Sequence, residues 1–231
     1  MKLLYEGKAK EVFSTDDPDK LIIKYKNSLT AGNGAKKADM EGKGALNCRI
    51  SNIIFGYLES NGVPTHFVRE IDETAIEVKK VEIVPLEVIV RNVAAGSFSK
   101  RYGVEEGSAL KCPVLEYSYK CDELGDPLIN DYHIMALGLA TREELDEIAA
   151  IAFRVNELLK AFFDKVGVRL IDFKIELGRY HGKIILADEI SPDSCRLWEK
   201  GTDEKLDKDR FRRDMGGVLE AYEKILKKID C

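Results

Sequence analysis

The sequence predicts an α+β fold of two lobes, in which a β-rich N-terminal lobe precedes a larger α/β lobe of strands and helices. Extended β-prone segments separated by turn residues fill most of the chain up to about residue 90. Long amphipathic helical patterns are concentrated after residue 140, and a pair of β-prone segments lies between them. The kinked segment KKVEIVP separates these regions, so we expect one lobe over residues 1–82 and the other over residues 83–231.

The N-terminal lobe begins with two predicted strands, LLYEGKAKEVFST and KLIIKYK, which the turn sequence DDPD separates. Gly7 permits a tight bend, and Lys8 and Lys10 alternate onto one face of the strand, where two ammonium groups could contact a polyphosphate. Two lysines on a solvated strand are the alternative. The spacing of apolar residues then predicts a helix from about residue 38 to residue 59, which the following Asn-Gly and Pro end.

Three extended segments follow in close succession, HFVREI, TAIEVKKV and PLEVIVRN. The third is nearly continuous in apolar residues, which is typical of a buried strand. Pro85 interrupts the strand pattern between the second and third segments. This linker could present backbone groups to a flat heterocycle in a cleft between the lobes, or it could be an ordinary kinked edge strand.

A candidate anion site follows the third segment, where Arg91 leads into the turn VAAGSFSKRYG. Small residues let backbone N–H groups approach an anion closely, and arginine supplies a bidentate fork for phosphate or carboxylate. A solvated basic turn is the alternative. The polar segment YSYKCDELGDPLINDYH comes next, and a loop of this length in a compact domain is usually functional or mobile.

Two helices complete the predicted framework. Thr141 and Glu144 form a capping box before a long amphipathic helix that Gly167 should end. A final helix is predicted over residues 208–229 without interruption. Gly216 and Gly217 fall inside it, and we expect close packing against a neighbour to explain them.

The stretch LIDFKIELGRYHGKIILADEISPDSCRLW holds the densest set of chemical residues and reads as a hairpin with a short glycine-bounded loop. Because side chains alternate along a strand, Asp172, Lys174 and Glu176 should share one face, with Ile171, Phe173, Ile175 and Leu177 facing a core. The returning strand adds Asp188, and the turn after it adds Asp193 and Arg196. Carboxylates in this arrangement suit Mg²⁺ held together with substrate phosphates, while simple ion pairing of an exposed row is the alternative.

Composition excludes several classes of protein. The net charge of -5, from 36 basic and 41 acidic residues in 231, argues against a general nucleic-acid surface. No apolar run is long enough for a signal peptide or a membrane span, so we expect a soluble cytoplasmic protein. Five cysteines without CxxC spacing indicate reduced thiols and neither a disulfide framework nor a structural zinc site.

Four motifs that occur in order across nearly the whole chain carry a family resemblance: YEGKAKEVFST, VPLEVIVRNVAAGSFSKRYG, LIDFKIELG and ADEISPDSCRLW. In these motifs the sequence closely resembles the SAICAR synthetase (phosphoribosylaminoimidazole-succinocarboxamide synthase) family of purine biosynthesis. The resemblance implies a two-lobed fold related to ATP-grasp and kinase-like folds, with a small β-rich ATP lobe. It also implies ATP-dependent ligation of L-aspartate to carboxyaminoimidazole ribonucleotide through an acyl phosphate, with Mg²⁺, giving SAICAR, ADP and phosphate.

The resemblance also assigns site residues. Its phosphate-contacting lysines and its adenine-binding linker fall at Lys8, Lys10, Glu82 and Ile83. Its positions for ATP-bound Mg²⁺ fall at Glu176 and Asp188, and its ribonucleotide-holding positions at Arg91, Ser97 and Arg196. The reacting end is lined by Asp172, Lys174 and Asp193, and we expect catalysis to depend on Lys174, Asp172 and Lys10. The polar loop over residues 122–130 is expected to close over the aspartate.

Two other functions are weighed against this one. A small-molecule kinase would use the same metal strand and lysine-bearing lobe for simple phosphoryl transfer. A nucleotide-binding regulatory module would bind without catalysis. The second anion site around RNVAAGS and Arg196 favours the ligase, because it calls for a phosphorylated cosubstrate whose carboxylate is activated for an amine. An exposed apolar helix face would allow a homodimer.

Overall fold

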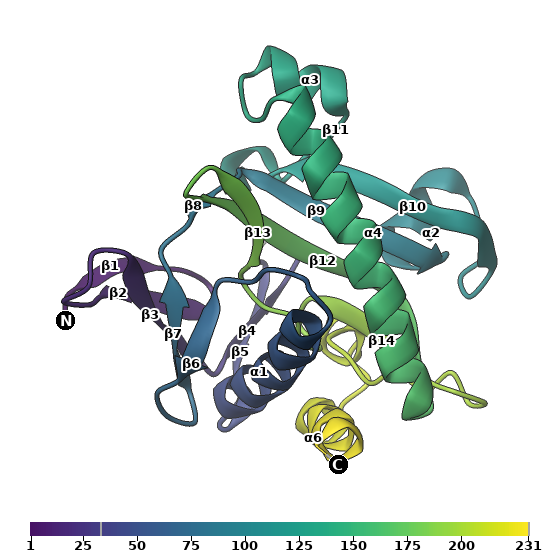
Figure 1. The fold of residues 1–231 in the computed structure, drawn as a ribbon. Coiled ribbons are helices and arrows are strands. Elements are labelled where there is room, and N and C mark those ends of the chain that lie inside the picture. The colour runs from purple at the N-terminus through teal and green to yellow at the C-terminus, as the bar shows by residue number, and fades with distance from the viewer. Residues whose placement is uncertain (33, 231) are drawn as a thin grey trace.

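The computed structural model describes residues 1–32 and 34–230 and contains two main β-sheets (Figure 1). The first sheet is antiparallel with strand order β1-β2-β3-β7-β6. Its strands are β1 (Leu3–Glu6), β2 (Lys10–Ser14), β3 (Lys20–Tyr25), β6 (Phe67–Glu70) and β7 (Ala75–Lys79). A separate hairpin of β4 (Ser28–Ala31) and β5 (Lys36–Asp39) follows it, so TAGNGAKK forms a hairpin tip of which Asn33 lies outside the described residues.

The second sheet has seven strands and is centred on β12 (Val168–Tyr180), which is the longest strand of the structure. The main path runs β11-β10-β9-β12-β13, and β8 and β14 also pair with β12. The other strands are β8 (Glu82–Ile83), β9 (Leu86–Val93), β10 (Ala109–Tyr119), β11 (Leu128–Ile129), β13 (Lys183–Ala187) and β14 (Cys195–Glu199). The predicted hairpin is therefore formed by β12 and β13. Strand β12 also pairs with β9, which precedes it in the chain, and with β14, which follows the hairpin.

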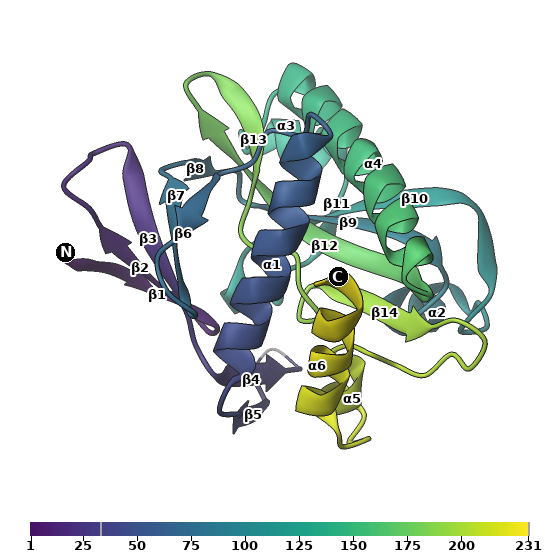
Figure 2. The same ribbon diagram turned by 60° about the horizontal axis from the view of Figure 1, so that its bottom comes forward.

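The helices cover this second sheet and fill the space beside it. In Figure 1, α4 (Arg142–Lys165) crosses one face of the sheet. Figure 2 shows α1 (Lys43–Ser60) between the two sheets and beside α6 (Val218–Ile229). The short helices are α2 (Gly96–Tyr102), η1 (Asp122–Leu124), α3 (Asp131–Ala136) and α5 (Asp209–Arg212). The main core joins apolar residues of α1, α4 and α6 to those of β9 and β12.

Local signals for the long helix α4 are confirmed. Thr141 accepts a hydrogen bond from the Glu144 N–H, and the Glu144 side chain accepts one from the Thr141 N–H, so the capping box is complete. Helix α4 ends at Lys165, and Gly167 follows with a φ of 71°. This is the left-handed conformation that favours glycine after a helix.

The prediction of one continuous final helix is wrong. The segment forms two helices, α5 and α6, and Gly216 and Gly217 separate them with φ values of 69° and 59°. These glycines supply a left-handed break and no close packing inside a helix. On α6, Tyr222 and Ile225 are fully buried at 0% exposure, while Leu219 and Leu226 are half-buried.

Strand β12 alternates largely as predicted. Phe173, Ile175 and Leu177 belong to the main core, while the opposite face carries the charged residues. Ile171 departs from this pattern, because the register of β12 against β14 shifts between Leu170 and Asp172. Ile171 therefore packs into a separate small cluster with Val93, Ala95 and Trp198.

Two further predictions concern cysteines and membranes. Cys48, Cys112, Cys121 and Cys195 are free thiols, and Cys231 lies outside the described residues. No helix formed by residues 1–32 and 34–230 is both long and apolar enough to cross a bilayer.

Candidate active site

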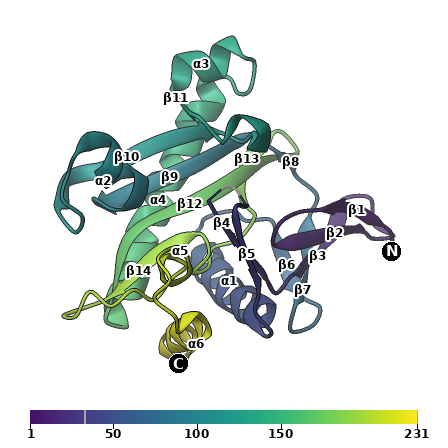
Figure 3. The ribbon, with the colours of Figure 1, turned by 180° about the vertical axis from the view of Figure 1, so that it is seen from behind.

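A cavity of about 520 Å³ lies over the charged face of β12 and is lined by residues from both sheets, the β4–β5 hairpin and α5. Figure 3 shows this face, with the hairpin and α5 standing over β12 and β14. A second cavity of about 270 Å³ adjoins it on the side of β1 and β2. The two cavities share Lys8, Thr30, Glu87, Asp126, Lys174, Asp193, Ser194 and Lys208 in their linings.

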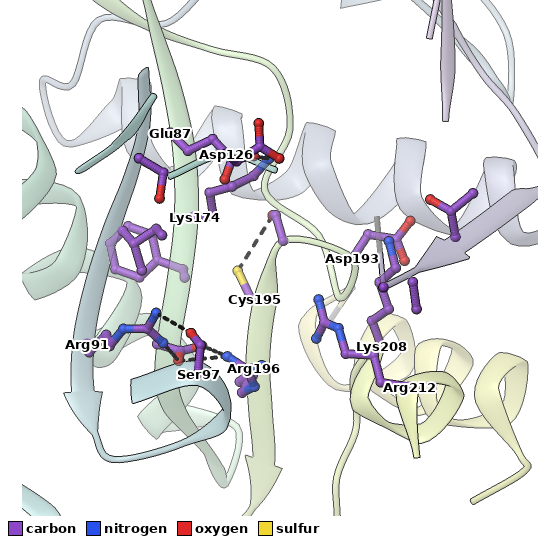
Figure 4. A pocket seen from close by; sticks show the side chains of 18 of the residues that line it. Glu87, Arg91, Ser97, Asp126, Lys174, Asp193, Cys195, Arg196, Lys208 and Arg212 are labelled. Atoms are coloured by element: carbon purple, nitrogen blue, oxygen red, sulfur yellow. Dashed lines mark hydrogen bonds and ion pairs between the residues drawn. The ribbon is translucent and has the colours of Figure 1, made fainter. Parts of the chain in front are cut away.

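One end of the larger cavity is built from arginines and carboxylates on three adjacent strands. Asp172 of β12 lies opposite Arg91 of β9 and opposite Arg196 of β14 in the strand registers. The Arg91 guanidinium donates to Asp172 at 2.8 Å, to Glu116 at 2.7 Å and to the Ser97 hydroxyl at 3.1 Å. Arg196 donates to both oxygens of Asp172, at 2.9 and 3.1 Å. The sheet therefore fixes two guanidinium groups side by side, as Figure 4 shows.

The turn before α2 leaves space for one of these groups. Gly96 has a φ of 55°, and a Cβ built on it would lie 2.4 Å from an Arg196 guanidinium nitrogen. Only glycine meets both demands, since other residues rarely adopt this backbone conformation and their Cβ would overlap the guanidinium. The sequence Ala-Gly-Ser therefore sets Arg196 against the turn that carries Ser97.

The opposite end, in the smaller cavity, holds lysines against buried carboxylates. Lys10 of β2 forms an ion pair with Asp188, and Glu189 lies 3.2 Å from the same ammonium. Although burial opposes it, the charges of Asp188 and Glu189 raise the pKa of Lys10. Burial likewise opposes ionisation of Asp188, but Lys10 and Lys174 lower its pKa overall. The first sheet thus contacts the second through a charged pair.

Lys174 lies between the two ends on β12 and lines both cavities. Its ammonium donates to Glu87 at 2.7 Å and lies 3.6 Å from Glu176. Burial would lower the pKa of Lys174, but the charges of Glu176 and Glu87 raise it overall, so the side chain stays charged. Burial and the charge of Asp188 raise the pKa of Glu176, although Lys174 and Lys120 oppose this.

Asp188 has a backbone conformation that is uncommon for residues other than glycine. Its φ is 61°, in the left-handed region, at the point where β13 ends. Conformations of this kind are held by their surroundings and cluster at functional sites. The ion pair to Lys10 lies at this strained residue.

Asp193 of the SPDS turn lines both cavities, and each of its carboxylate oxygens accepts a hydrogen bond from the protein. Lys43 of α1 donates to Oδ2 at 2.8 Å, and the Tyr222 hydroxyl of α6 donates to Oδ1 at 2.6 Å. Lys43 also donates to the Ser28 carbonyl at 2.8 Å. Burial opposes ionisation, yet the charges of Lys208 and Lys43 lower the pKa of Asp193 to about 2.

Ten of the twelve residues assigned from the sequence line one or both cavities. In the smaller cavity or in both these are Lys8, Lys10, Lys174, Glu176, Asp188 and Asp193, and in the larger cavity alone they are Arg91, Ser97, Asp172 and Arg196. Glu82 and Ile83 do not line either cavity. Both belong to β8 at the edge of β12, where the Glu82 carboxylate pairs with Arg179 at 3.0 Å.

Sequence reasoning missed several charged residues of the cavities and their walls: Lys43, Glu87, Glu116, Lys120, Glu189, Lys208 and Arg212. Glu87 and Glu116 lie on β9 and β10, within apolar strands, where an isolated acid is a usable signal. Glu189 directly follows Asp188 in the charged turn. Lys43 and Lys208 fall in predicted helices and Lys120 in a polar loop, and no local pattern relates them to the site, so only the fold brings them there.

Comparison with known proteins identifies the family of the chain. A sequence profile of the family described as SAICAR synthetase matches residues 3–229. The phosphoribosylaminoimidazole-succinocarboxamide synthases of Clostridium acetobutylicum and Lachnoclostridium phytofermentans are 60% and 58% identical over 228 and 229 residues, with 99% of this chain and 97% of each relative covered.

Solved structures show the same likeness. The crystal structure of the synthase from Ehrlichia chaffeensis has a TM-score of 0.97 and 41% identity, covering 99% of this chain and 98% of that one. A structure described as SAICAR synthetase (Type-2) in complex with ADP has a TM-score of 0.95 and 49% identity, covering 97% and 96%. The chain therefore belongs to the SAICAR synthetase family, whose members are carbon–nitrogen ligases of purine biosynthesis that join L-aspartate to carboxyaminoimidazole ribonucleotide with consumption of ATP.

Proposed function

We propose that the two ends of the joined cavities divide the substrates of this ligation between them. The observation that carries the proposal is the presence of two separate cationic ends, with Lys174 between them. The paired guanidinium groups of Arg91 and Arg196, together with the Ser97 hydroxyl, suit the phosphate of the ribonucleotide. Asp172 orients both arginines. Lys8 and Lys10 suit the phosphates of ATP at the other end.

The residues around the junction suit activation of a carboxylate. A carboxylate is a poor electrophile until one oxygen becomes a good leaving group, which transfer of the γ-phosphoryl group provides. The ribonucleotide carboxylate attacks the γ-phosphorus, ADP leaves, and the amine of aspartate then displaces phosphate from the acyl phosphate. Lys10 and Lys174 neutralise charge that develops on the transferring phosphoryl group.

The nucleotide site is proposed to extend along the edge of the first lobe. A relative that is 49% identical is described as a complex with ADP, which supports a nucleotide site in this chain. We assign residues 1–82 to the ATP lobe, with Glu82 and Ile83 presenting backbone groups to the adenine. The two residues lie at the segment that leaves the first sheet and joins the second, which agrees with this assignment.

Glu176 and Asp188 are proposed to hold Mg²⁺ with ATP. Glu176 is buried, at 4% exposure, and the Asp188 side chain is half-buried, at 26%; burial and the Asp188 charge raise the pKa of Glu176. A divalent cation would relieve this repulsion. No group of three or more His, Cys, Asp or Glu suited to a metal is found among residues 1–32 and 34–230, so phosphate oxygens must complete the ligand set, as is usual for Mg²⁺. When bound, the ion would neutralise phosphate charge during transfer.

Lys208 is proposed to bind a carboxylate of L-aspartate. The attacking amine must reach the acyl phosphate, so aspartate must lie near the junction of the two cavities, and Lys208 lines both. Arg212 is one turn further along α5 and also lines the larger cavity. The loop over residues 122–130 reaches the same region, because Lys8 pairs with Asp122 at 2.7 Å and Asp126 lines both cavities.

The test is to mix the protein with Mg-ATP, carboxyaminoimidazole ribonucleotide and aspartate and to measure product and ADP together. Equal amounts are expected. ADP formation without incorporation of aspartate would instead support the kinase function. Lys208→Ala should raise KM for aspartate by about 10- to 100-fold, because a hydrogen bond to a charged group contributes about 1.5–3 kcal/mol. Its affinity for ADP and for the ribonucleotide should stay near wild type.

Asp188→Asn and Glu176→Gln test the metal assignment by calorimetry. Both changes keep the side-chain shape and remove a charge, so binding of ADP should lose its dependence on Mg²⁺ while the fold persists. Unchanged Mg²⁺ dependence in both variants would refute the assignment.

A further inference from the structure

The cations that line the two cavities differ in whether they form an ion pair with the protein. All but one form ion pairs with carboxylates of the protein, and these are Lys8, Lys10, Arg91, Arg101, Lys120, Lys174, Arg196 and Arg212. The exception is Lys208, whose ammonium makes no hydrogen bond or ion pair with any residue in the described ranges 1–32 and 34–230. Its pKa is lowered, first by burial, although the charge of Asp193 opposes this.

The acid that could pair with Lys208 is close by but already engaged. The Lys208 N–H donates to the Pro192 carbonyl at 3.0 Å, next to Asp193, and both side chains line the two cavities. Figure 4 shows Asp193 and Lys208 on the same side of the pocket. The two oxygens of Asp193 instead accept from Lys43 at 2.8 Å and from Tyr222 at 2.6 Å. Lys43 and Tyr222 thus supply one donor to each oxygen of Asp193, and Lys208 donates no hydrogen bond to either oxygen.

Lys43 is held firmly in this position. Its side chain is 1% exposed, and its ammonium is shared between Asp193 and the Ser28 carbonyl. Tyr222 is fully buried on α6. Burying a lysine is costly unless it is paired, and Lys43 satisfies this by neutralising Asp193. The ion pair of Asp193 is thus made with Lys43, while Lys208 acts on the same carboxylate without an ion pair or hydrogen bond to it.

We propose that Lys43 and Tyr222 are positioning residues that occupy the Asp193 carboxylate and thereby keep Lys208 free to receive a carboxylate of the amino-acid substrate. Asp193 then acts through Lys208 and does not itself hold the substrate. This inference rests on the proposed role of Lys208. The inference explains why Asp193 can line a cavity in which an anionic substrate must bind. The charge of Asp193 is already neutralised by the buried Lys43.

The decisive experiment compares Lys43→Met, Asp193→Asn and the double variant in steady-state kinetics. In Lys43→Met the Asp193 carboxylate loses its cation and pairs with Lys208, so KM for aspartate should rise by about tenfold or more. KM for ATP and for the ribonucleotide should change by less than about threefold. In the double variant both charges are absent and Lys208 is free again, so KM for aspartate should return to within about threefold of wild type.

A second readout follows Lys208 directly. Brief labelling with acetic anhydride, analysed by mass spectrometry, should modify Lys208 several-fold more slowly in Lys43→Met than in wild type, because an ion-paired ammonium is protonated and engaged. Labelling in the double variant should match wild type. Lys200→Met is the matched control, since Lys200 pairs with Asp164 and lines neither cavity. It should leave KM and labelling unchanged.

Several results would overturn the proposal. A double variant as impaired for aspartate as Lys43→Met would show a purely structural role. Should Lys43→Met fail to fold, the double variant, which leaves neither charge unpaired, decides together with Asp193→Asn. KM for aspartate should stay within about threefold of wild type in both, and a rise of tenfold in both would mean that Asp193 contacts the substrate. The proposed function is tested separately by Lys208→Ala. If that variant raises KM for aspartate and Lys43→Met folds but does not, only the present inference fails.

Discussion

Replacement of Arg91 by lysine tests whether the arginine and carboxylate network carries the ribonucleotide end of the site. Arg91 is 3% exposed and makes three side-chain hydrogen bonds, to Glu116, Asp172 and Ser97. Lysine keeps the charge but has no planar fork, so it can keep the contact to one carboxylate and must give up the other.

The magnitude follows from the partners of the two carboxylates. Breaking a buried ion pair usually costs about 3–5 kcal/mol, because an uncompensated charge is left behind. Here Asp172 would keep Arg196 at 2.9 Å, and Glu116 would keep Arg101 at 3.0 Å. The loss should therefore be that of one charge-assisted hydrogen bond, about 1.5–3 kcal/mol. For a chain of this length, at about 2–4 °C per kcal/mol, that corresponds to a fall in Tm of about 3–12 °C.

The functional effect should be larger and selective. The cavity loses one of two fixed guanidinium groups, so KM for the ribonucleotide should rise by about 10- to 100-fold, while Kd for ADP stays within about threefold of wild type. Thermal unfolding, urea titration and calorimetry with each ligand measure these quantities. Equal weakening of both ligands, or a stability loss above about 5 kcal/mol in spite of the retained arginines, would refute the reasoning.

Four further predictions concern other parts of the molecule. Lys10→Ala should weaken Mg-ATP binding and Arg196→Ala the ribonucleotide, in separate calorimetric titrations, and a crossed result would reverse the assignment of the two ends. Gly96→Ala should weaken the ribonucleotide with ADP unaffected, because its Cβ would lie 2.4 Å from the guanidinium of Arg196; normal ribonucleotide affinity would contradict the argument from space. Thr141→Ala, far from the cavities, should cost about 1 kcal/mol in urea unfolding through loss of the helix cap and leave every KM unchanged. Burial, with the charge of a neighbouring aspartate, raises the pKa of Asp207 to about 7 from 3.8, so the folded protein keeps a proton that the unfolded chain has released. This contribution to stability is complete below about pH 4 and is lost as pH rises to 7, and a variant Asp207→Asn should show a flatter fall in unfolding free energy over that window.

The sequence by itself determined the features that depend on local spacing. Alternation along β12 set Asp172, Lys174 and Glu176 on one face, because residues two apart on a strand share a side whatever lies around them. The capping box at Thr141 needs only residues three apart, and it formed as predicted. The order of the motifs was enough to indicate the family, since it spans nearly the whole chain.

Only the tertiary structure decided which charges neutralise one another. Lys43 and Asp193 are 150 positions apart, and Lys10 and Asp188 are 178 apart, so no local pattern links them. The register shift beside Leu170 turned Ile171 away from the main core, and such a shift depends on how β14 pairs with β12. Two adjacent glycines in a helical pattern are compatible with close packing inside one helix and with a break between two helices. The left-handed conformation of Gly216 and Gly217 depends on the segments that they connect, which the tertiary structure decides. Among the cations that line the two cavities, Lys208 is recognised as the one without an ion pair only when the long-range pairs within residues 1–32 and 34–230 are in place. An ion pair depends on distance in space and not on position along the chain.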